Sequence, residues 1–322
     1  MNILLTAINA KYIHSNLAVY SLRACAGEYR DAVELAEYTI NNQKDYILEE
    51  LYKRKPDVLC FSCYIWNIDY VTDIAREYKK LCPSVPIWVG GPEVSYEVEA
   101  FLRENPYIDG VMIGEGEDTF RELCGYYAHK RKLSDIAGIA FRKNSTGNST
   151  SNSTSVNNIG GNKAGEIVFT SPRPIKNMSE IPFCYDTLDD FSNRIIYYES
   201  SRGCPFSCSY CLSSVDKTLR FRDTEIVKRE LKFFIDQKVP QIKFVDRTFN
   251  CNHAHAMELW RFIKANDNGV TNFHFEISAD LLNQEELELI SDMRPGLIQL
   301  EIGVQSTNEV TIKEIHRTMK LE

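Results

Sequence analysis

The sequence predicts an α/β protein, with a doubly wound, Rossmann-like parallel sheet at the N-terminus and a partial (β/α) barrel after it. Two observations support this. Short apolar runs alternate with longer, charged, helix-like segments in the first 130 residues, and the same alternation returns after residue 194. The length of 322 residues also exceeds the usual size of a single core, which favours two domains.

The N-terminal domain is expected to span residues 1–132. Its predicted strands are NILLTAI at 2–8, VELAEYTI at 33–40, DVLCFSCYI at 57–65, PIWVGG at 86–91 and GVMIGEG at 110–116. Doubly wound sheets bind their ligands in the crevice at the carboxyl ends of the strands. The candidate binding residues at these ends are Asn9, Ser62, Tyr64, Gly90, Gly91, Glu115 and Gly116.

Residues 133–193 are expected to form a hairpin linker between the two domains. The runs AGIAFRK and GEIVFTS are strand-like, and they flank a low-complexity loop at 144–163 that is rich in Asn, Ser, Thr and Gly. Such a loop cannot bury enough apolar area to offset the entropy of ordering it. The segment SPRPIKNMSEIPFCYD that follows is punctuated by proline, which is typical of an extended connector.

The second domain is expected at 194–322. Its predicted strands are RIIYYES at 194–200, QIKFVD at 241–246, FHFEIS at 273–278 and LIQLEIGV at 297–304, with helices near 224–237, 252–266, 283–293 and 308–318. Polar and apolar residues alternate along the third and fourth strands, which predicts one face under helices and one polar face toward a lumen. Because only four strands are present, we expect a truncated, partial barrel.

Composition excludes several classes of function. Acidic residues outnumber basic ones by 45 to 37, which argues against general binding to nucleic acid or anionic lipid. No apolar run reaches the ~18 residues that a membrane span needs. The first residues, MNILLTAINAKY, do not resemble a secretory signal, so we expect a cytoplasmic protein with reduced cysteines.

Three of the ten cysteines lie within eight residues, at Cys204, Cys208 and Cys211, directly after the first strand of the second domain. A loop at the carboxyl end of a strand is where α/β barrels place their chemistry. Three thiolates can hold three irons of a 4Fe-4S cluster and leave the fourth iron open to a ligand. A structural zinc site, in a binding module without enzymatic activity, is the alternative, and its fourth ligand would be Cys184 or Cys251.

This cysteine motif, with Tyr210 before its last member, resembles the motif of the radical S-adenosylmethionine (SAM) superfamily. The resemblance implies a radical SAM barrel in which the amino and carboxylate groups of SAM chelate the open iron. One electron then cleaves SAM to methionine and a 5'-deoxyadenosyl radical. A reductant such as flavodoxin or ferredoxin is the partner that this chemistry requires.

The same resemblance assigns further residues to SAM. KFVDRTFN matches the second-strand motif that holds the amino group of SAM, and EIGVQS at 301–306 matches a fourth-strand segment near its ribose or methionine part. The residues concerned are Asp246, Glu301, Gln305 and Ser306; Arg317 in EIHRTM is assigned to the carboxylate, and Glu276 of the third strand is a further candidate. Glu276 is equally consistent with a solvated strand end.

The N-terminal domain resembles the cobalamin (vitamin B12) binding domain that precedes a radical SAM domain in a large subgroup. CFSCYIWN, WVGGPEVS and GEGE carry this resemblance. Glycines there would let a flat ring approach the backbone. The motif Asp-x-His-x-x-Gly is absent, so we expect cobalamin without a histidine ligand, and His14 as a polar residue at a helix start.

Two other cysteine and histidine patterns are expected to be structural. Residues three apart on a strand point to opposite faces, so Cys60 and Cys63 are predicted to be buried small hydrophobes, not a redox pair. The segment CNHAH at 251–255 is predicted to begin a helix, with Asn252 as its cap, and not to bind metal.

The leading hypothesis is a cobalamin-dependent radical SAM enzyme that transfers a methyl group to an unactivated carbon. Cyclisation or rearrangement by the same radical is the alternative within this class, and so is a first domain that does not bind cobalamin. The substrate, a small or lipid-like molecule, is not identified by the sequence.

Overall fold

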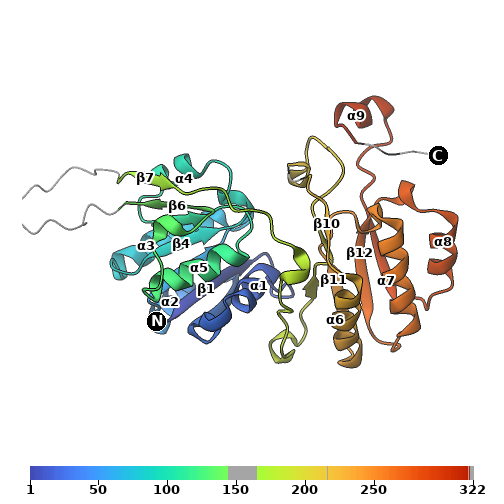
Figure 1. Cartoon of the computed structure of the whole chain (residues 1–322), viewed down its shortest axis with the longest axis horizontal. Helices are drawn as coiled ribbons and strands as arrows, with labels where there is room; N and C mark the ends of the chain where they lie inside the picture. The colour runs from blue at the N-terminus through green and yellow to red at the C-terminus, as the bar shows by residue number, and fades with distance from the viewer. Residues whose placement is uncertain (144–164, 216, 318, 320–322) are drawn as a thin grey trace, which may run out of the picture. The chain divides into compact units, whose positions relative to one another are not determined.

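The chain divides into two compact units, residues 1–175 and 176–322 (Figure 1). The structure, a computed structural model, describes residues 1–143, 165–215, 217–317 and 319. The low-complexity loop at 144–163 therefore lies outside the described residues. Within the described part of the chain, no helix is both long enough and apolar enough to cross a membrane.

Unit 1 is built on a seven-stranded sheet with the order β2-β1-β3-β4-β5-β6-β7. Its strands are β1 Ile3–Asn9, β2 Val33–Thr39, β3 Val58–Ser62, β4 Ile87–Gly90, β5 Gly110–Met112, β6 Ile139–Arg142 and β7 Ile167–Phe169. The first five run parallel, and β6 and β7 are antiparallel. All seven residues of β1 are buried, as expected for a central parallel strand that is covered on both faces.

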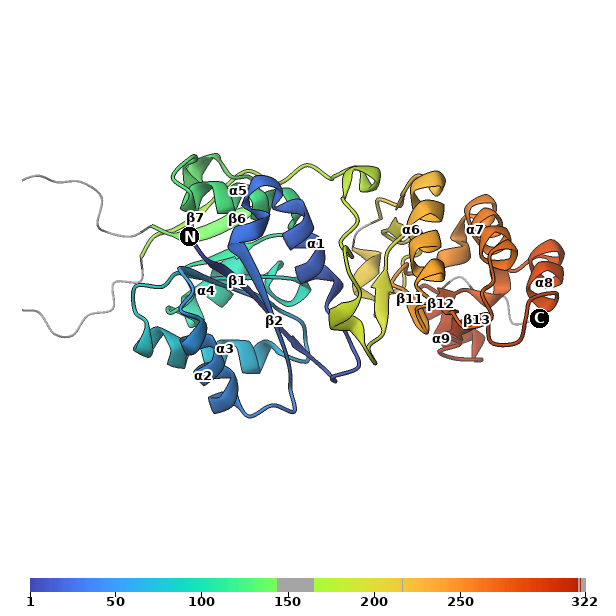
Figure 2. The same ribbon diagram turned by 90° about the horizontal axis from the view of Figure 1, so that it is seen from below.

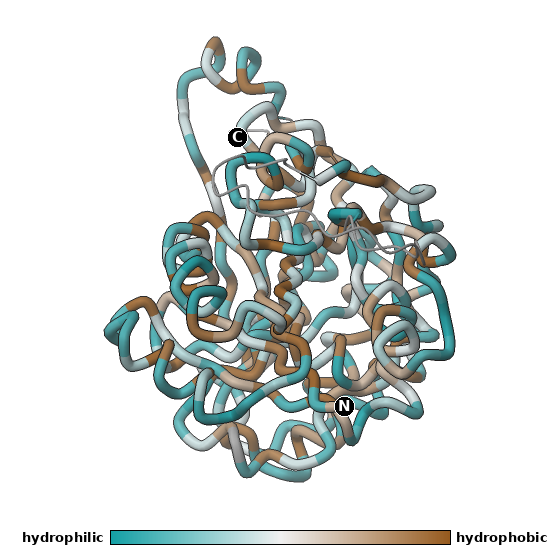
Figure 3. The backbone as a smooth tube through the Cα atoms, turned by 90° about the vertical axis from the view of Figure 1, so that its left-hand side faces the viewer, coloured by the Kyte–Doolittle hydropathy of each residue, from teal (hydrophilic) through white to brown (hydrophobic). Residues whose placement is uncertain are grey.

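Helices cover both faces of this sheet, which confirms the doubly wound fold. Figure 2 shows α1 and α5 on one face and α2, α3 and α4 on the other. Their bounds are α1 Leu17–Cys25, α2 Lys44–Arg54, α3 Ile68–Leu81, α4 Val98–Glu104 and α5 Glu117–Tyr127. Hydrophobic and hydrophilic residues are interspersed along the chain (Figure 3), and the residues that these helices bury are mostly apolar, such as Ile47 and Leu51 of α2.

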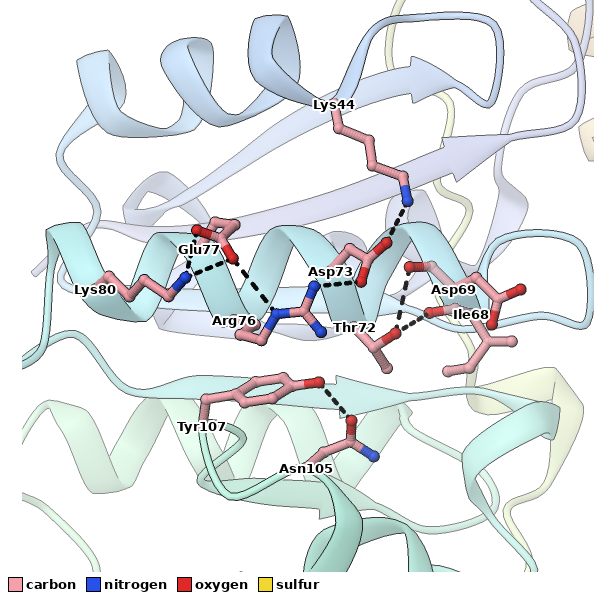
Figure 4. A network of polar contacts seen from close by, with 10 residues as sticks. All are labelled: Lys44, Ile68, Asp69, Thr72, Asp73, Arg76, Glu77, Lys80, Asn105 and Tyr107. Atoms are coloured by element: carbon pink, nitrogen blue, oxygen red, sulfur yellow. Dashed lines mark hydrogen bonds and ion pairs between the residues drawn. The ribbon is translucent and has the colours of Figure 1, made fainter.

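Helix α3 illustrates this division between two faces. Val71, Ile74, Ala75 and Tyr78, at the spacing of one helix face, are all buried. On the opposite face Asp73 pairs with Lys44 of α2 and with Arg76 (Figure 4). The Lys44 ammonium lowers the pKa of Asp73. Ion pairs this exposed contribute at most about 1 kcal/mol each, so the network stabilises the contact between α2 and α3 only slightly.

The hairpin of β6 and β7 extends the first sheet and is not a separate linker. Met112 of β5 pairs with Ile139 of β6, and Arg142 of β6 pairs with Ile167 of β7. The backbone of β5 has a free hydrogen-bonding edge that β6 fills, and Ile139 and Ala140 become fully buried there. The first unit therefore ends at residue 175, beyond the boundary expected at 132.

Unit 2 contains a four-stranded parallel sheet with the order β13-β12-β11-β8, as expected for a partial (β/α) barrel. Its strands are β8 Ile196–Tyr198, β11 Gln241–Phe244, β12 Asn272–Ile277 and β13 Ile298–Ile302. Its helices are α6 Thr224–Asp236, α7 His253–Ala265, α8 Gln284–Ser291 and α9 Glu309–Glu314. A short antiparallel pair, β9 Ser201–Arg202 and β10 Arg220–Phe221, follows β8.

The alternation predicted for the third strand is present in β12. Phe273, Phe275 and Ile277 are buried, whereas His274 and Glu276 are only half-buried. The Asn252 side chain accepts a hydrogen bond from the backbone N–H of His255 at 3.2 Å, so this residue caps α7 as expected.

The connector after residue 175 belongs to unit 2, because a buried arginine holds it there. Arg222 is 6% exposed and donates to the carbonyls of Met178 and Ile181, both at 2.7 Å. It also pairs with Glu230 of α6 at 2.6 Å, and the Tyr198 hydroxyl donates to the same carboxylate at 2.6 Å. The expected boundary at 193 therefore moves to 175.

Candidate functional site

The three predicted ligand cysteines lie in one loop, residues 203–214, which we call the cluster loop. Cys204 and Cys208 are buried at 8% and 9% exposure, and Cys211 is half-buried. The Sγ atom of Cys204 lies 3.8 Å from the Thr248 hydroxyl, just beyond the carboxyl end of β11. The loop therefore stands at the edge of the sheet where barrel enzymes place their chemistry.

Glycine is required where the chain enters the cluster loop. Gly203 has φ +92°, a conformation that side chains rarely adopt, and a Cβ there would lie 2.6 Å from the carbonyl oxygen of Thr218. The turn that carries Cys204 away from β9 thus depends on a missing side chain.

The donor set fits an iron-sulfur cluster better than a single zinc ion. In the described part of the chain, no three or more Cys, His, Asp or Glu side chains converge as ligands of one metal ion. A cluster does not require such convergence, because each thiolate binds a different iron. Burial, followed by the neighbouring Cys204, raises the pKa of Cys251 to about 11, so in the absence of a metal ion this side chain is a neutral thiol.

Asp246 lies under the start of this loop and is fully buried. It accepts hydrogen bonds from the Ser200 N–H at 3.0 Å, the Ser200 hydroxyl at 2.7 Å and the Ser201 hydroxyl at 2.5 Å. Burial raises the pKa of Asp246 to about 6 in spite of these bonds. The Ser200 hydroxyl also lies 3.1 Å from Nε2 of His255, whose pKa burial lowers to about 4.

The C-terminal segment reaches the cluster loop through Arg317. Its guanidinium donates to the Tyr210 hydroxyl at 3.0 Å and to the carbonyl of Gly303. The backbone N–H of Ser209 donates to the carbonyl of Ile315 at 2.9 Å. The structure thus brings together Tyr210 and Arg317, which the sequence assigned separately.

Two residues of the fourth-strand motif, Gln305 and Ser306, lie between β13 and α9. Gln305 is exposed and has φ +64°. The Ser306 hydroxyl accepts a hydrogen bond from the N–H of Asn308 at 3.1 Å, so it helps to start α9.

The polar face of the second sheet carries a charged row. Lys243 lies 2.7 Å from a carboxylate oxygen of Glu301 and 3.6 Å from one of Glu276. His274 Nε2 lies 3.1 Å from the same Glu301 oxygen. Burial raises the pKa of Glu276, whereas the hydrogen bond from Lys243 lowers that of Glu301. Sequence reasoning missed Lys243, although its alternation with Ile242 and Phe244 places it on this face.

In unit 1 the strand order reverses between β1 and β3, which is the switch point where such sheets bind ligands. Asn9 and Ser62 end these two strands, and Asn16 contacts both. The Asn9 amide donates to Glu37 at 2.9 Å and to the carbonyl of His14 at 3.1 Å. Sequence reasoning missed Glu37, which also accepts from the N–H of Asn16 at 2.9 Å.

An aromatic platform, formed by Tyr64 and Trp66, follows β3. The two rings stack at 4.4 Å between centroids with planes 8° apart, and Trp66 is 45% exposed. Ile65, between the two rings, is exposed as well, and exposed apolar residues also follow β1 and β4, namely Tyr12, Ile13 and Tyr96. Sequence reasoning singled out Tyr64 but not the stacking, which local spacing does not reveal.

The glycines of this edge differ in their roles. Gly91, next to Gly90, has φ +117°, and a Cβ there would lie 2.4 Å from the carbonyl oxygen of Cys63. Gly116, beside the half-buried Glu115, caps α5, where a Cβ would lie 2.9 Å from Leu22 of α1, so this glycine serves helix packing.

Cys60 and Cys63 are buried at 1% and 0% exposure, and burial raises the pKa of both thiols. This confirms the prediction that they act as small hydrophobes.

Comparisons with known proteins match both units. The family model of the B12 binding domain matches residues 3–124, and that of the radical SAM superfamily matches residues 198–322. An uncharacterized methyltransferase, PH0819 of Pyrococcus horikoshii, is 31% identical over 222 residues, which cover 66% of this chain and 44% of the relative. The cobalamin-dependent radical SAM methyltransferase TokK of Streptomyces tokunonensis is 29% identical over 255 residues, 73% of this chain and 33% of the relative.

A solved structure shares the fold over almost the whole chain. The cobalamin-dependent S-adenosylmethionine radical enzyme OxsB, with aqua-cobalamin and S-adenosylmethionine bound, superposes with a TM-score of 0.74 at 18% identity. The match covers 98% of this chain and 46% of OxsB. The chain thus spans less than half the length of each of these three proteins.

Proposed function

We infer the function from one premise: this chain belongs to the radical SAM superfamily and carries a B12 binding domain N-terminal to its radical SAM domain. We propose that it forms the cofactor-binding part of a cobalamin-dependent radical SAM methyltransferase that methylates an unactivated carbon. The observation that carries this proposal is the cluster loop at the carboxyl edge of the second sheet, with Cys204, Cys208 and Cys211 on it.

The three cysteines would hold three irons of a 4Fe-4S cluster and leave the fourth iron for SAM. When bound, these groups and cobalamin supply reductive cleavage of SAM and delivery of a methyl group. The role of the polypeptide is to bind these cofactors, to orient them and to exclude water from the site. Arg317 would orient the SAM carboxylate, and its hydrogen bond to Tyr210 attaches it to the cluster loop. The polar residues proposed to line the rest of the SAM site are Glu276, Glu301, Gln305 and Ser306.

In unit 1 the aromatic platform supports the cobalamin part of the proposal. Stacked rings with an exposed face suit the flat underside of a corrin ring, and Gly91 allows close approach of the backbone. Asn9 and Ser62 at the switch point, with Gly90 and Glu115, complete the proposed contacts. No Asp-x-His-x-x-Gly motif follows β1, so we propose that cobalt receives no histidine ligand from this loop.

The test starts from anaerobic reconstitution of the chain with iron and sulfide, followed by addition of hydroxocobalamin. We expect about four irons and four sulfides per chain, saturable cobalamin binding, and a cobalt(II) EPR spectrum without splitting from a histidine nitrogen. With a strong reductant, SAM should be cleaved to methionine and 5'-deoxyadenosine. Zinc alone in place of iron would overturn the enzyme proposal.

Methyl transfer has its own test, on the substrate of the full-length protein once one is found to consume SAM. SAM labelled in its methyl group should leave the label on the product carbon. An unlabelled product that is cyclised or rearranged would contradict methyl transfer and leave the radical SAM assignment standing. In the cell the electron would come from a small one-electron carrier such as flavodoxin or ferredoxin.

A further inference from the structure

Asp246 stands at the carboxyl end of β11 and is one of the most enclosed polar groups of unit 2. We propose that Asp246 is a positioning residue for the cluster loop and not a ligand of SAM: through Ser200 and Ser201 it sets the direction in which the chain leaves β8. The inference rests on the proposed function, because it presupposes that the cluster loop holds a cluster.

Both oxygens of the Asp246 carboxylate are engaged. One accepts the backbone N–H of Ser200 at 3.0 Å, and the other accepts the hydroxyls of Ser200 and Ser201 at 2.7 and 2.5 Å. Ser200 is held from a further side, since its carbonyl accepts the N–H of Arg222 at 2.8 Å. Ser201 precedes Cys204 by three residues. These hydrogen bonds therefore fix the backbone position at which the cluster loop begins.

Burial closes the approach that a SAM ligand would need. Asp246 and Ser200 are each 0% exposed and Ser201 is 3% exposed, so the groups that surround the carboxylate are themselves covered. His255, at 6% exposure, lies on the far side of the Ser200 hydroxyl. A buried carboxylate is costly unless hydrogen bonds satisfy it, and the two serines supply them. An ammonium group would have to displace a serine to reach Asp246.

This role explains why a carboxylate stands at this position. A residue behind a metal ligand fixes its orientation, and loss of such a residue typically costs 10- to 100-fold in metal affinity or activity. Glu276 and Glu301, in contrast, lie on the polar face with partly exposed carboxylates. They remain the better candidates for polar contacts with SAM.

The experiment compares Asp246→Ala with the double variant S200A/S201A. The two serine hydroxyls donate to Asp246 and would not contact SAM, so their removal tests the positioning role alone. Each reconstituted protein is analysed for iron and sulfide, for the rate at which a chelator removes iron, and for SAM affinity from the EPR change of the reduced cluster. We expect both variants to lose iron about 10- to 100-fold faster than wild type. The clusters that remain should bind SAM with near wild-type affinity.

Glu286→Gln is the matched control. Glu286, on α8, is also 0% exposed. It accepts hydrogen bonds from the Asn283 N–H and from His253, both at 2.9 Å. Its loss should lower stability without hastening iron release. Should Asp246→Ala fail to fold, Asp246→Asn keeps the size and one acceptor oxygen, and the serine variant still decides.

Three outcomes would overturn the inference. If Asp246→Ala retains iron but weakens SAM binding while S200A/S201A behaves as wild type, Asp246 is a SAM ligand. If Glu286→Gln releases iron as fast as the other variants, the effect is a general loss of stability. A wild-type chain that holds no iron would refute the proposed function itself, and this failure is visible before any variant is made.

Discussion

The carboxyl edges of the two parallel sheets carry opposite kinds of chemistry. The edge in unit 1 presents stacked rings at Tyr64 and Trp66 and bare backbone at Gly91. The edge in unit 2 presents the thiols of the cluster loop, with Asp246 and Ser200 beneath it. Both edges are made by the same arrangement of parallel strands under helices, so the fold supplies the location and the side chains supply the chemistry.

The largest difference should appear between cysteines of the two units. Cys208→Ala removes one of three thiolates, so we expect reconstituted iron to fall sharply and SAM cleavage to reach background. Cys63→Ala removes a fully buried thiol from unit 1 and should cost about 1 kcal/mol of unfolding free energy, with iron and SAM cleavage unchanged. Iron analysis and assay of 5'-deoxyadenosine separate the two. Continued cleavage by Cys208→Ala would contradict the ligand assignment.

Gly203 and Gly91 play the same structural role in the two units, since each allows a tight turn at the carboxyl edge of its sheet. Alanine at either position should therefore disturb ligand binding only at that edge. Each alanine would combine a positive φ with a Cβ within 2.6 Å of a carbonyl oxygen, at a cost of about 2 to 4 kcal/mol. Gly203→Ala should lower iron retention and spare cobalamin binding, whereas Gly91→Ala should do the reverse. Thermal unfolding, iron analysis and cobalamin titration of both variants test this. If either variant lost both iron and cobalamin binding, the two edges would not be independent.

The stability of unit 2 should also depend on pH, because His255 is buried in its neutral form. Burial lowers its pKa to about 4, and the weaker effect of Glu258 raises it. Between pH 6.5 and 4 the unfolded chain therefore binds the proton more readily, and stability is lost as pH falls, by about 3 kcal/mol in full. Asp246 has the opposite effect on stability, because burial raises its pKa to about 6. Its contribution to stability is present at low pH and is lost as pH rises through 6.

The measurement is urea unfolding of wild type and His255→Gln at pH 7 and pH 5. We expect the variant to lose less stability on acidification than wild type. Equal losses in the two proteins would mean that His255 accepts its proton without cost in the folded state.

The smallest effect is expected at the aromatic platform. Trp66→Ala removes one ring of the stacked pair, and we expect cobalamin affinity to fall about tenfold, equivalent to ~1.4 kcal/mol, with iron content unchanged. Tyr52→Ala, which truncates a 50% exposed ring on α2, is the control and should leave cobalamin binding intact. Absorbance titration with hydroxocobalamin measures both. Unaltered affinity in Trp66→Ala would place the ring elsewhere on the edge.

The sequence predicted the strands well, because apolar periodicity is a local property. Each predicted strand of unit 1 overlaps an observed one, and the parallel order follows from the intervening helices. The pairing of Ile139 with Met112 was not predictable in the same way, since it depends on which edge of the sheet is left free. The domain boundary moved for this reason.

The site was predicted in its position more than in its contacts. The motif located Asp246 at a strand end, but its burial depends on Ser201, 45 residues away in the sequence. Trp66 was included only as part of the matched segment CFSCYIWN, because stacking on Tyr64 depends on the loop conformation after β3. Residue types and spacing thus propose the members of a site, whereas side-chain partners distant in sequence decide the contacts that each member makes.

The anchoring of the connector by Arg222 determines where the protein can be dissected. A fragment that begins at residue 194 would lack the carbonyls of Met178 and Ile181, which leaves a guanidinium buried with Glu230 as its main partner. A buried charge without its hydrogen bonds is strongly destabilising. Recombinant fragments of the second half, or chimaeras that exchange it between relatives, should therefore start near residue 176 and carry the connector with them.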